Sequence, residues 1–212
     1  MIISVLNLKG GSGKSTISTN LAVAANLDGF RVLLIDTDPQ ATSIRWAGER
    51  PDTAAKISVV AIPDAKALKK QITEFTKDYD MIIIDGAPQL DLISTTSIAV
   101  SETVLIPVSP SPYDIWATEN IVQRVKIAQE INSKLTAYFI VNRDNPRTLL
   151  SQDTNEALKE LGLPLFCVKL HNRIAYADSA LNGLSVLEWT DQKAKDEVNA
   201  LYSELKQLME IK

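Results

Sequence analysis

A glycine-rich stretch near the start of the chain carries the residues best suited to chemistry. Residues 9–16 read Lys-Gly-Gly-Ser-Gly-Lys-Ser-Thr, between an apolar run at 2–6 and a segment with helical spacing at 16–25. A strand, a glycine-rich turn and a helix in this order are the context of a P-loop, whose backbone N–H groups surround a polyphosphate. We therefore expect Lys14 to reach the terminal phosphates and the Ser15 hydroxyl to bind a magnesium ion. The residues predicted to contact the nucleotide here are Lys9, Gly10, Gly11, Ser12, Gly13, Lys14, Ser15 and Thr16.

The loop departs from the general P-loop pattern at its start. Gly10 lies only three residues before Gly13, and Lys9 precedes the glycines. A glycine-rich turn that binds nothing is the alternative. It is disfavoured because Gly-Lys-Ser stands between a strand and a helix, and because two carboxylate segments follow.

Two further apolar runs end in carboxylates. Residues 33–35 precede Asp36 and Asp38, and residues 81–84 precede Asp85. Beside a P-loop these acids are candidates for binding magnesium and positioning an attacking water, because both need anionic oxygens close by. An apolar strand that ends in an acid is common, so these segments support the prediction only in company with the loop.

A polar pair, Asn142 and Arg143, closes a later apolar run and is a candidate base contact. An amide can donate to and accept from an adenine edge, and a guanidinium can stack over it. A surface turn with a capping asparagine is the alternative. The string Asn-Arg-Asp also has a faint likeness to a guanine-specificity motif, so the residues alone leave ATP and GTP both open.

The elements that must position these residues alternate along the chain. Apolar runs predict strands at 2–6, 31–36, 57–61, 81–85, 103–108, 135–141 and 165–168. Helical spacing predicts helices at 16–25, 64–77, 114–131 and 190–212. Continuous apolar strands that alternate with helices predict an α/β fold, a single doubly wound, mostly parallel sheet covered on both faces, in one domain of residues 1–212.

Composition excludes several classes of function. The net charge of −4 does not indicate a nucleic-acid binder, so any contact with DNA would need a local basic patch. A single histidine, His171, leaves no room for a histidine-based metal cluster. The single cysteine, Cys167, makes no internal disulfide and is predicted as a buried strand residue. No apolar run is long enough to cross a bilayer.

The lysine-flanked loop resembles the deviant Walker A loop of the ParA/MinD family of ATPases. Residues 33–40 are similar to the family's second signature. Residues 81–88 are similar to its Walker B segment, although Gly-Ala-Pro replaces the common Thr-Pro-Pro. Residues 142–144 lie at the family's base-recognition position, which implies ATP as the nucleotide and Asn142 and Arg143 as its base contacts.

This resemblance implies a slow, Mg²⁺-dependent ATP hydrolysis in a nucleotide-sandwich homodimer. Lys9 would reach the partner's phosphates, Lys14 would bind its own, and Asp38 would position the hydrolytic water. Magnesium would be bound directly by Ser15, through a water by Asp85, and with help from Asp38. Asp36 is interpreted mainly as a structural carboxylate.

The resemblance also implies macromolecular partners. The ATP dimer would bind nucleoid DNA without sequence preference, and a cargo-bound adaptor would stimulate hydrolysis in the cytoplasm. The candidates for the DNA-facing patch are Arg147, Lys169, Arg173, Lys193 and Lys195. Solvated surface charge is the alternative for each of them. The cargo stays open among a plasmid, a chromosome region and a protein organelle such as the carboxysome.

Two other functions remain as alternatives. A MinD-like membrane switch would need a C-terminal amphipathic anchor with a basic polar face. Acids are interspersed in the tail at 190–212, so no stable membrane association is expected. A metabolic P-loop enzyme, such as a dethiobiotin-synthetase-like ligase, would not need a lysine at position 9.

Overall fold

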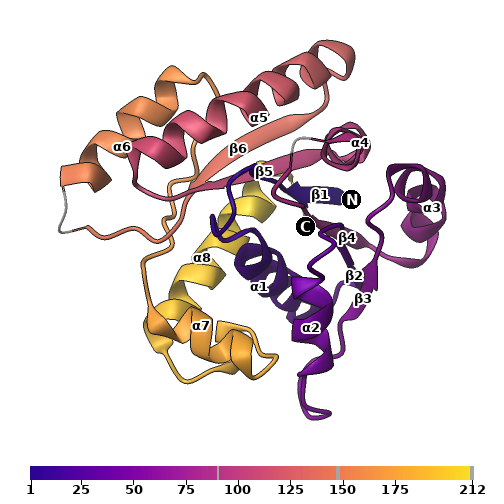
Figure 1. The fold of residues 1–212 in the computed structure, drawn as a ribbon. Coiled ribbons are helices and arrows are strands. Elements are labelled where there is room, and N and C mark those ends of the chain that lie inside the picture. The colour runs from indigo at the N-terminus through magenta and orange to yellow at the C-terminus, as the bar shows by residue number, and fades with distance from the viewer. Residues whose placement is uncertain (90, 147–148, 211–212) are drawn as a thin grey trace.

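The computed structural model describes residues 1–89, 91–146 and 149–210. Within them lies one parallel sheet with the strand order β3-β2-β4-β1-β5-β6 (Figure 1). The strands are β1 (Ile2–Val5), β2 (Val32–Asp36), β3 (Ser58–Ala61), β4 (Met81–Asp85), β5 (Thr103–Val108) and β6 (Thr136–Val141). Four of the six strands are buried along their whole length, as expected for a sheet covered on both faces. The predicted α/β class and parallel sheet are confirmed.

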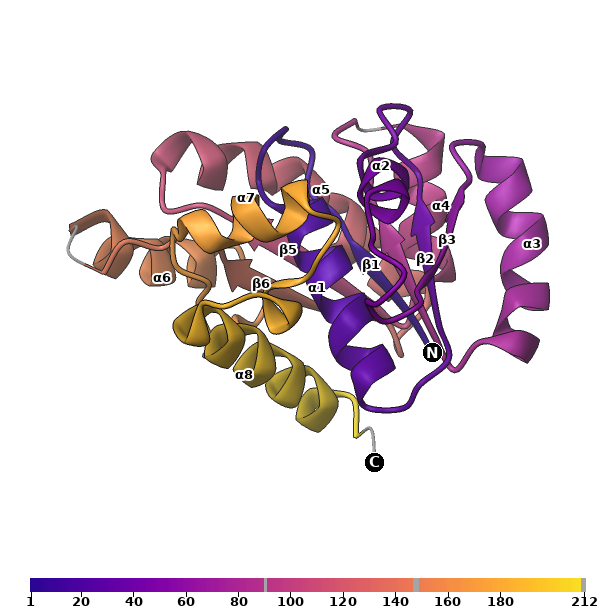
Figure 2. The same cartoon turned by 90° about the horizontal axis from the view of Figure 1, so that it is seen from below.

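Helices cover both faces of this sheet. They are α1 (Lys14–Leu27), α2 (Thr42–Gly48), α3 (Ala65–Asp78), α4 (Leu92–Val100), α5 (Pro112–Ile131), α6 (Leu149–Glu160), α7 (Ile174–Leu181) and α8 (Gln192–Leu208), with a short 3₁₀ turn, η1 (Val186–Glu188). Helices α1, α7 and α8 pack together over one face, where they share a core with alternate residues of β1, β2 and β4 (Figure 2). Helices α3, α4 and α5 cover the opposite face, over the other set of strand residues.

The strand order brings the chemistry-bearing loops to one edge. β1 lies between β4 and β5, and β4 in turn pairs with β2 in parallel. The carboxyl ends of these strands therefore meet, and the loops that follow them line a crevice in the way usual for open α/β sheets. In this register Asp36 at the end of β2 stands opposite Asp85 at the end of β4.

The strand predicted at 165–168 does not form. Leu165 makes only an isolated parallel bridge with Phe139 of β6. Phe166 still donates its backbone N–H to the carbonyl of Phe139 at 2.9 Å. The N–H groups of Cys167 and Val168 leave the sheet, because they donate to the carboxylate of Glu204 on α8, at 2.6 and 2.9 Å. Cys167 is exposed, so the prediction that it is a buried strand residue was wrong.

The C-terminal helix, predicted at 190–212, spans Gln192–Leu208 and docks on the domain. Asp191 caps its start by accepting the backbone N–H of Ala194, and the buried side chains of Val198, Leu201 and Leu205 join the core beside α1. The other predicted strands and helices are found within about two residues of their expected bounds, whereas α2, α4, α6 and α7 were not predicted. None of the described helices is long and apolar enough to cross a bilayer.

Candidate nucleotide-binding site

The glycine-rich loop joins β1 to α1 and exposes backbone toward a cavity. Gly11 and Gly13 have φ angles of 76° and 97°, in the left-handed region that favours glycine. A side chain at Gly13 would also collide with the amide of Asn142. At Gly10 and Gly11, by contrast, an added Cβ would meet nothing within 4 Å. The loop thus presents open backbone next to the N-terminus of α1, a combination that favours an anion.

Lys14, the first residue of α1, carries an ammonium group into this region. Its side chain is buried, and its Nζ donates to the carbonyl of Lys9 at 3.2 Å. Burial lowers the pKa of Lys14, and the nearby carboxylates of Asp85 and Asp38 act against that shift. A buried cation is costly unless it is paired with an anion. A bound phosphate would supply that anion.

Asp85 and Asp36 are buried side by side behind the loop. Asp85 accepts hydrogen bonds from the hydroxyls of Ser43 at 2.7 Å and Ser18 at 3.3 Å. Burial raises the pKa of Asp85 to about 6, although the Ser43 hydrogen bond and the charge of Lys14 oppose the rise. Charge on Asp36 adds to the rise, so a cation beside Asp85 would relieve a real electrostatic cost.

Asp36 holds the backbone that follows β2. Its carboxylate accepts the backbone N–H groups of Asp38, Ser43 and Ile44, at 3.0, 2.8 and 3.2 Å. Burial also raises the pKa of Asp36, against these hydrogen bonds. This arrangement agrees with the structural role assigned to Asp36, because it fixes the start of α2 and the loop that carries Asp38.

Asp38 faces the same cavity as the glycine-rich loop. It is half-buried, and its Oδ1 accepts the backbone N–H of Gln40 at 2.9 Å. The residues that line the cavity are Gly10, Gly11, Gly13, Lys14, Ser15, Thr16, Asp38, Thr42, Pro88 and Arg143. The structure therefore brings Lys14, Ser15 and Asp38 together at one cavity from separate segments of the sequence, whereas the predicted residues Lys9, Ser12 and Asp85 are not part of its lining.

A magnesium ion here would depend on the nucleotide. Among residues 1–89, 91–146 and 149–210, no group of three or more His, Cys, Asp or Glu side chains could hold a metal ion. Ser15 lies in the cavity, and Asp85 is buried behind it. One direct hydroxyl ligand with nearby carboxylates fits a magnesium ion that keeps waters and shares phosphate oxygens.

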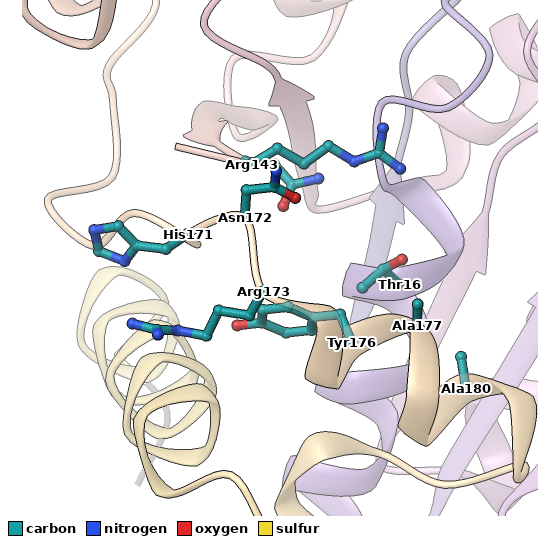
Figure 3. A pocket seen from close by; sticks show the side chains of 9 residues that line it. Thr16, Arg143, His171, Asn172, Arg173, Tyr176, Ala177 and Ala180 are labelled. Carbon is teal, nitrogen blue, oxygen red and sulfur yellow. The ribbon is translucent and has the colours of Figure 1, made fainter. Parts of the chain in front are cut away.

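A second cavity lies beside the first and shares Thr16 and Arg143 with it. Figure 3 shows its lining, which comes from α1, α7 and the segments after β6: Thr16, Asn142, Arg143, His171, Asn172, Arg173, Tyr176, Ala177 and Ala180. The guanidinium of Arg143 extends toward the start of α1. Asn142 and Arg143, the residues predicted to contact the base, therefore both line this second cavity.

Asn142 makes a contact within the chain that the sequence did not indicate. Its Nδ2 donates to the carbonyl of Ser12 at 2.8 Å, and its side chain is buried against Gly13. The amide therefore ties the end of β6 to the glycine-rich loop. Its contact with a base, like that of the exposed Arg143, stays a prediction.

Lys9 makes two contacts that no pattern in the sequence indicates. Its Nζ forms an ion pair with Asp114 on α5, and its backbone N–H donates to Oδ1 of Asn7 at 3.0 Å. The sequence places Asp114 only within a predicted helix, and no motif in it includes Asn7. Asp114 comes close to Lys9 because β1 and β5, which precede the glycine-rich loop and α5, are neighbours in the sheet.

The basic residues proposed for DNA contact have different surroundings. Arg173 forms an ion pair with Glu197, with its Nε and terminal nitrogen at 2.8 and 2.6 Å from Oε1, so its charge is already used within the chain. Lys193 on α8 is exposed, whereas Lys195 and Lys169 are half-buried. Arg147 lies outside the described residues.

Comparison with known proteins agrees with this geometry. Residues 3–186 match the family described as the CobQ/CobB/MinD/ParA nucleotide binding domain. The "Maintenance of carboxysome distribution protein A" of Halothiobacillus neapolitanus is 30% identical over 206 residues, which cover 96% of this chain and 95% of that protein.

Two solved structures share the fold. The Cyanothece McdA–ATP complex has a TM-score of 0.81 and 20% identity, and covers 100% of this chain and 96% of its own. The septum site-determining protein MinD from Pyrococcus horikoshii, complexed with Mg-ADP, has a TM-score of 0.79 and 20% identity over 99% of this chain and 97% of its own.

Proposed function

The chain belongs to the CobQ/CobB/MinD/ParA nucleotide-binding family, and from this premise we propose that it is an ATP-driven positioning protein that alternates between a monomer and an ATP-bound dimer. The observation that carries the proposal is the lysine-flanked glycine loop with Lys14 buried against it. Lys14 would bind the phosphates of its own subunit. Lys9, which stands at the rim of the same loop, would reach those of the partner.

The nucleotide would lie across both cavities. Its phosphates would occupy the loop, near Lys14, Ser15 and Asp38, and its base would enter the cavity beside Arg143 and α7. Magnesium, when bound between Ser15 and the phosphates, would neutralise charge that develops during phosphoryl transfer. Asp38 would orient the attacking water, because it is the cavity-lining carboxylate that is not buried.

The ATP dimer would bind DNA without sequence preference, and an adaptor on the cargo would stimulate hydrolysis and release the subunits. The Halothiobacillus protein, named for carboxysome distribution, matches along almost the whole chain, which supports a protein organelle of that kind as the cargo. Lys193 and Lys195 on α8 are the candidates for phosphate contact. Two copies of them would be brought together by dimerisation, which strengthens a weak basic patch.

A membrane-bound switch is disfavoured by α8. Val198, Leu201 and Leu205 of this helix are buried in the domain core and are not available to a lipid surface, which leaves Leu208 as its exposed large apolar side chain. Vesicles of anionic lipid should therefore not co-sediment the protein with ATP.

The test is DNA retention measured with ATP, with ADP and without nucleotide, across a salt series. We expect retention with Mg-ATP alone, weakened steeply by salt because the contacts are to phosphates. Lys14→Ala, which removes the phosphate-binding ammonium, should abolish retention under all three conditions. Retention that is the same with and without nucleotide would contradict the proposed switch.

A further inference from the structure

Lys9, the residue assigned to the partner's phosphates, is engaged within its own chain. Its Nζ pairs with Oδ1 of Asp114 at the start of α5. The Asp114 side chain is only 11% exposed and that of Lys9 is 39% exposed. The pair is therefore partly withdrawn from water, where an attraction between charges is stronger than at an open surface.

The backbone of Lys9 is held as well. Its N–H donates to the buried side chain of Asn7 at 3.0 Å, and Asn7 in turn donates to the carbonyl of Pro107 at 2.7 Å. The Lys9 carbonyl accepts Nζ of Lys14 at 3.2 Å. Lys9 is thus attached at three points, its amine, its N–H and its carbonyl, all to its own subunit.

We propose that Asp114 is a positioning residue that holds Lys9 against its own subunit and so opposes dimerisation until nucleotide binds. The proposal rests on the proposed function, in which Lys9 must cross to the partner. One ammonium cannot pair closely with Asp114 and with the partner's phosphate, so the ion pair competes with the dimer contact. The apparent dimer affinity is then reduced by the fraction of chains whose Lys9 is free.

The third attachment connects this hold to the nucleotide. Lys14 donates to the Lys9 carbonyl, and it is also the residue placed to bind the phosphates. A phosphate that recruits Lys14 would take away one of the three attachments of Lys9. The hold would therefore be strongest in the nucleotide-free chain and weakest once a nucleotide is bound, when crossing is required.

The experiment compares Asp114→Asn with Glu119→Gln. Both substitutions remove one negative charge from α5, but Glu119 is exposed. Sedimentation equilibrium with Mg-ATP should show an about two- to 25-fold tighter dimer for Asp114→Asn, because two ion pairs, each worth up to about fivefold, no longer oppose it. Glu119→Gln should match the wild type. An unchanged dimer affinity in Asp114→Asn would overturn the proposal, and a weaker dimer would place Asp114 in the dimer contact instead.

A second measurement examines the hold in the monomer. Competitive labelling of lysine amines without nucleotide, read by mass spectrometry, should show Lys9 reacting several-fold faster in Asp114→Asn than in wild type or Glu119→Gln. Equal reactivity would overturn the proposal. Asp114→Ser serves as the second variant if the asparagine variant fails to fold. A wild type that does not dimerise with Mg-ATP would refute the proposed function, whereas the labelling result would still decide whether Asp114 holds Lys9.

Discussion

Two charged regions of this molecule are built in opposite ways. At the nucleotide edge, formed by Lys14, Asp36, Asp38 and Asp85, a buried ammonium donates to a backbone carbonyl and two buried carboxylates have raised pKa values. At the α7–α8 corner, formed by His171, Arg173, Tyr176 and Glu197, one carboxylate accepts hydrogen bonds from all three other side chains.

The pKa values express the same difference. Burial alone would raise the pKa of Glu197, but hydrogen bonds from Arg173, His171 and Tyr176 outweigh it and lower that pKa. Asp85 has hydroxyl donors and a more distant Lys14, and its pKa stays raised. At the α7–α8 corner the charge of Glu197 is stabilised by its own neighbours, whereas at the nucleotide edge the charge of Asp85 is destabilised by burial. A ligand or ion of opposite charge that binds in the crevice can stabilise such a buried charge.

The largest expected effect comes from Lys14. Lys14→Met should weaken ATP binding by about 100-fold or more, because charge-assisted hydrogen bonds to the phosphates are lost. The melting temperature should stay equal or rise, because a buried ammonium is replaced by an apolar side chain of similar length. Calorimetric titration with ATP and thermal melts measure the two effects. Lys193→Met, at an exposed lysine on α8, is the matched control and should leave ATP binding unchanged. A clear loss of stability in Lys14→Met would show that Lys14 stabilises the fold, as Glu197 does, and would contradict the difference between the two regions.

Glu197→Gln, in contrast to Lys14→Met, should reduce the stability of the fold. It should lower the free energy of unfolding by about 2–3 kcal/mol, because Arg173 keeps a partly buried charge without its partner. The folded pKa of Glu197 is below its unfolded value, so its contribution is present at neutral pH and is lost as pH falls through the folded pKa. Urea unfolding at neutral and acid pH should therefore show that the difference in the free energy of unfolding between wild type and variant becomes smaller in acid. Asp196→Asn, at an exposed neighbour, should change stability by less than about 0.5 kcal/mol. A difference that becomes larger in acid would contradict the stabilising role of the ionised Glu197.

The smallest effect is expected at Asp85. Its folded pKa of about 6 lies above the ordinary 3.8, so the folded state binds the extra proton and wild-type stability falls as pH rises between these values. Without nucleotide, Asp85→Asn should therefore raise the free energy of unfolding at pH 7 by about 1–2 kcal/mol, and by almost nothing near pH 4. Urea unfolding of both proteins across this pH range measures the difference, with Asp52→Asn in an exposed loop as the control. A variant less stable than wild type at pH 7 would show that Asp85 stabilises the chain without a cation.

Local patterns were enough to predict much of the fold and the phosphate-binding part of the site. The buried strands are short apolar runs, and the loop lies where glycines, a lysine and a serine stand between a strand and a helix. These features depend on neighbours in sequence, so they can be read without the fold. The short helices α2 and α7 offer too few turns for a clear period, and they were missed.

What could not be predicted depends on contacts between distant segments. The run at 165–168 is apolar enough for a strand, but Glu204 takes two of its backbone N–H groups. The ion pair of Arg173 with Glu197 on α8 likewise joins two segments that no spacing rule connects, and a DNA contact by Arg173 stays a prediction. The partner of Lys9 is Asp114, more than a hundred residues away, and no spacing rule connects them.

The proposed switch requires ATP to hold two copies of the chain together. Sedimentation velocity of Asp38→Ala, which should bind Mg-ATP without hydrolysing it, tests this directly. We expect a species of twice the 23.3 kDa chain mass with Mg-ATP, and the single chain with Mg-ADP or without nucleotide. A protein that binds Mg-ATP to saturation and still sediments as one chain would contradict the central claim.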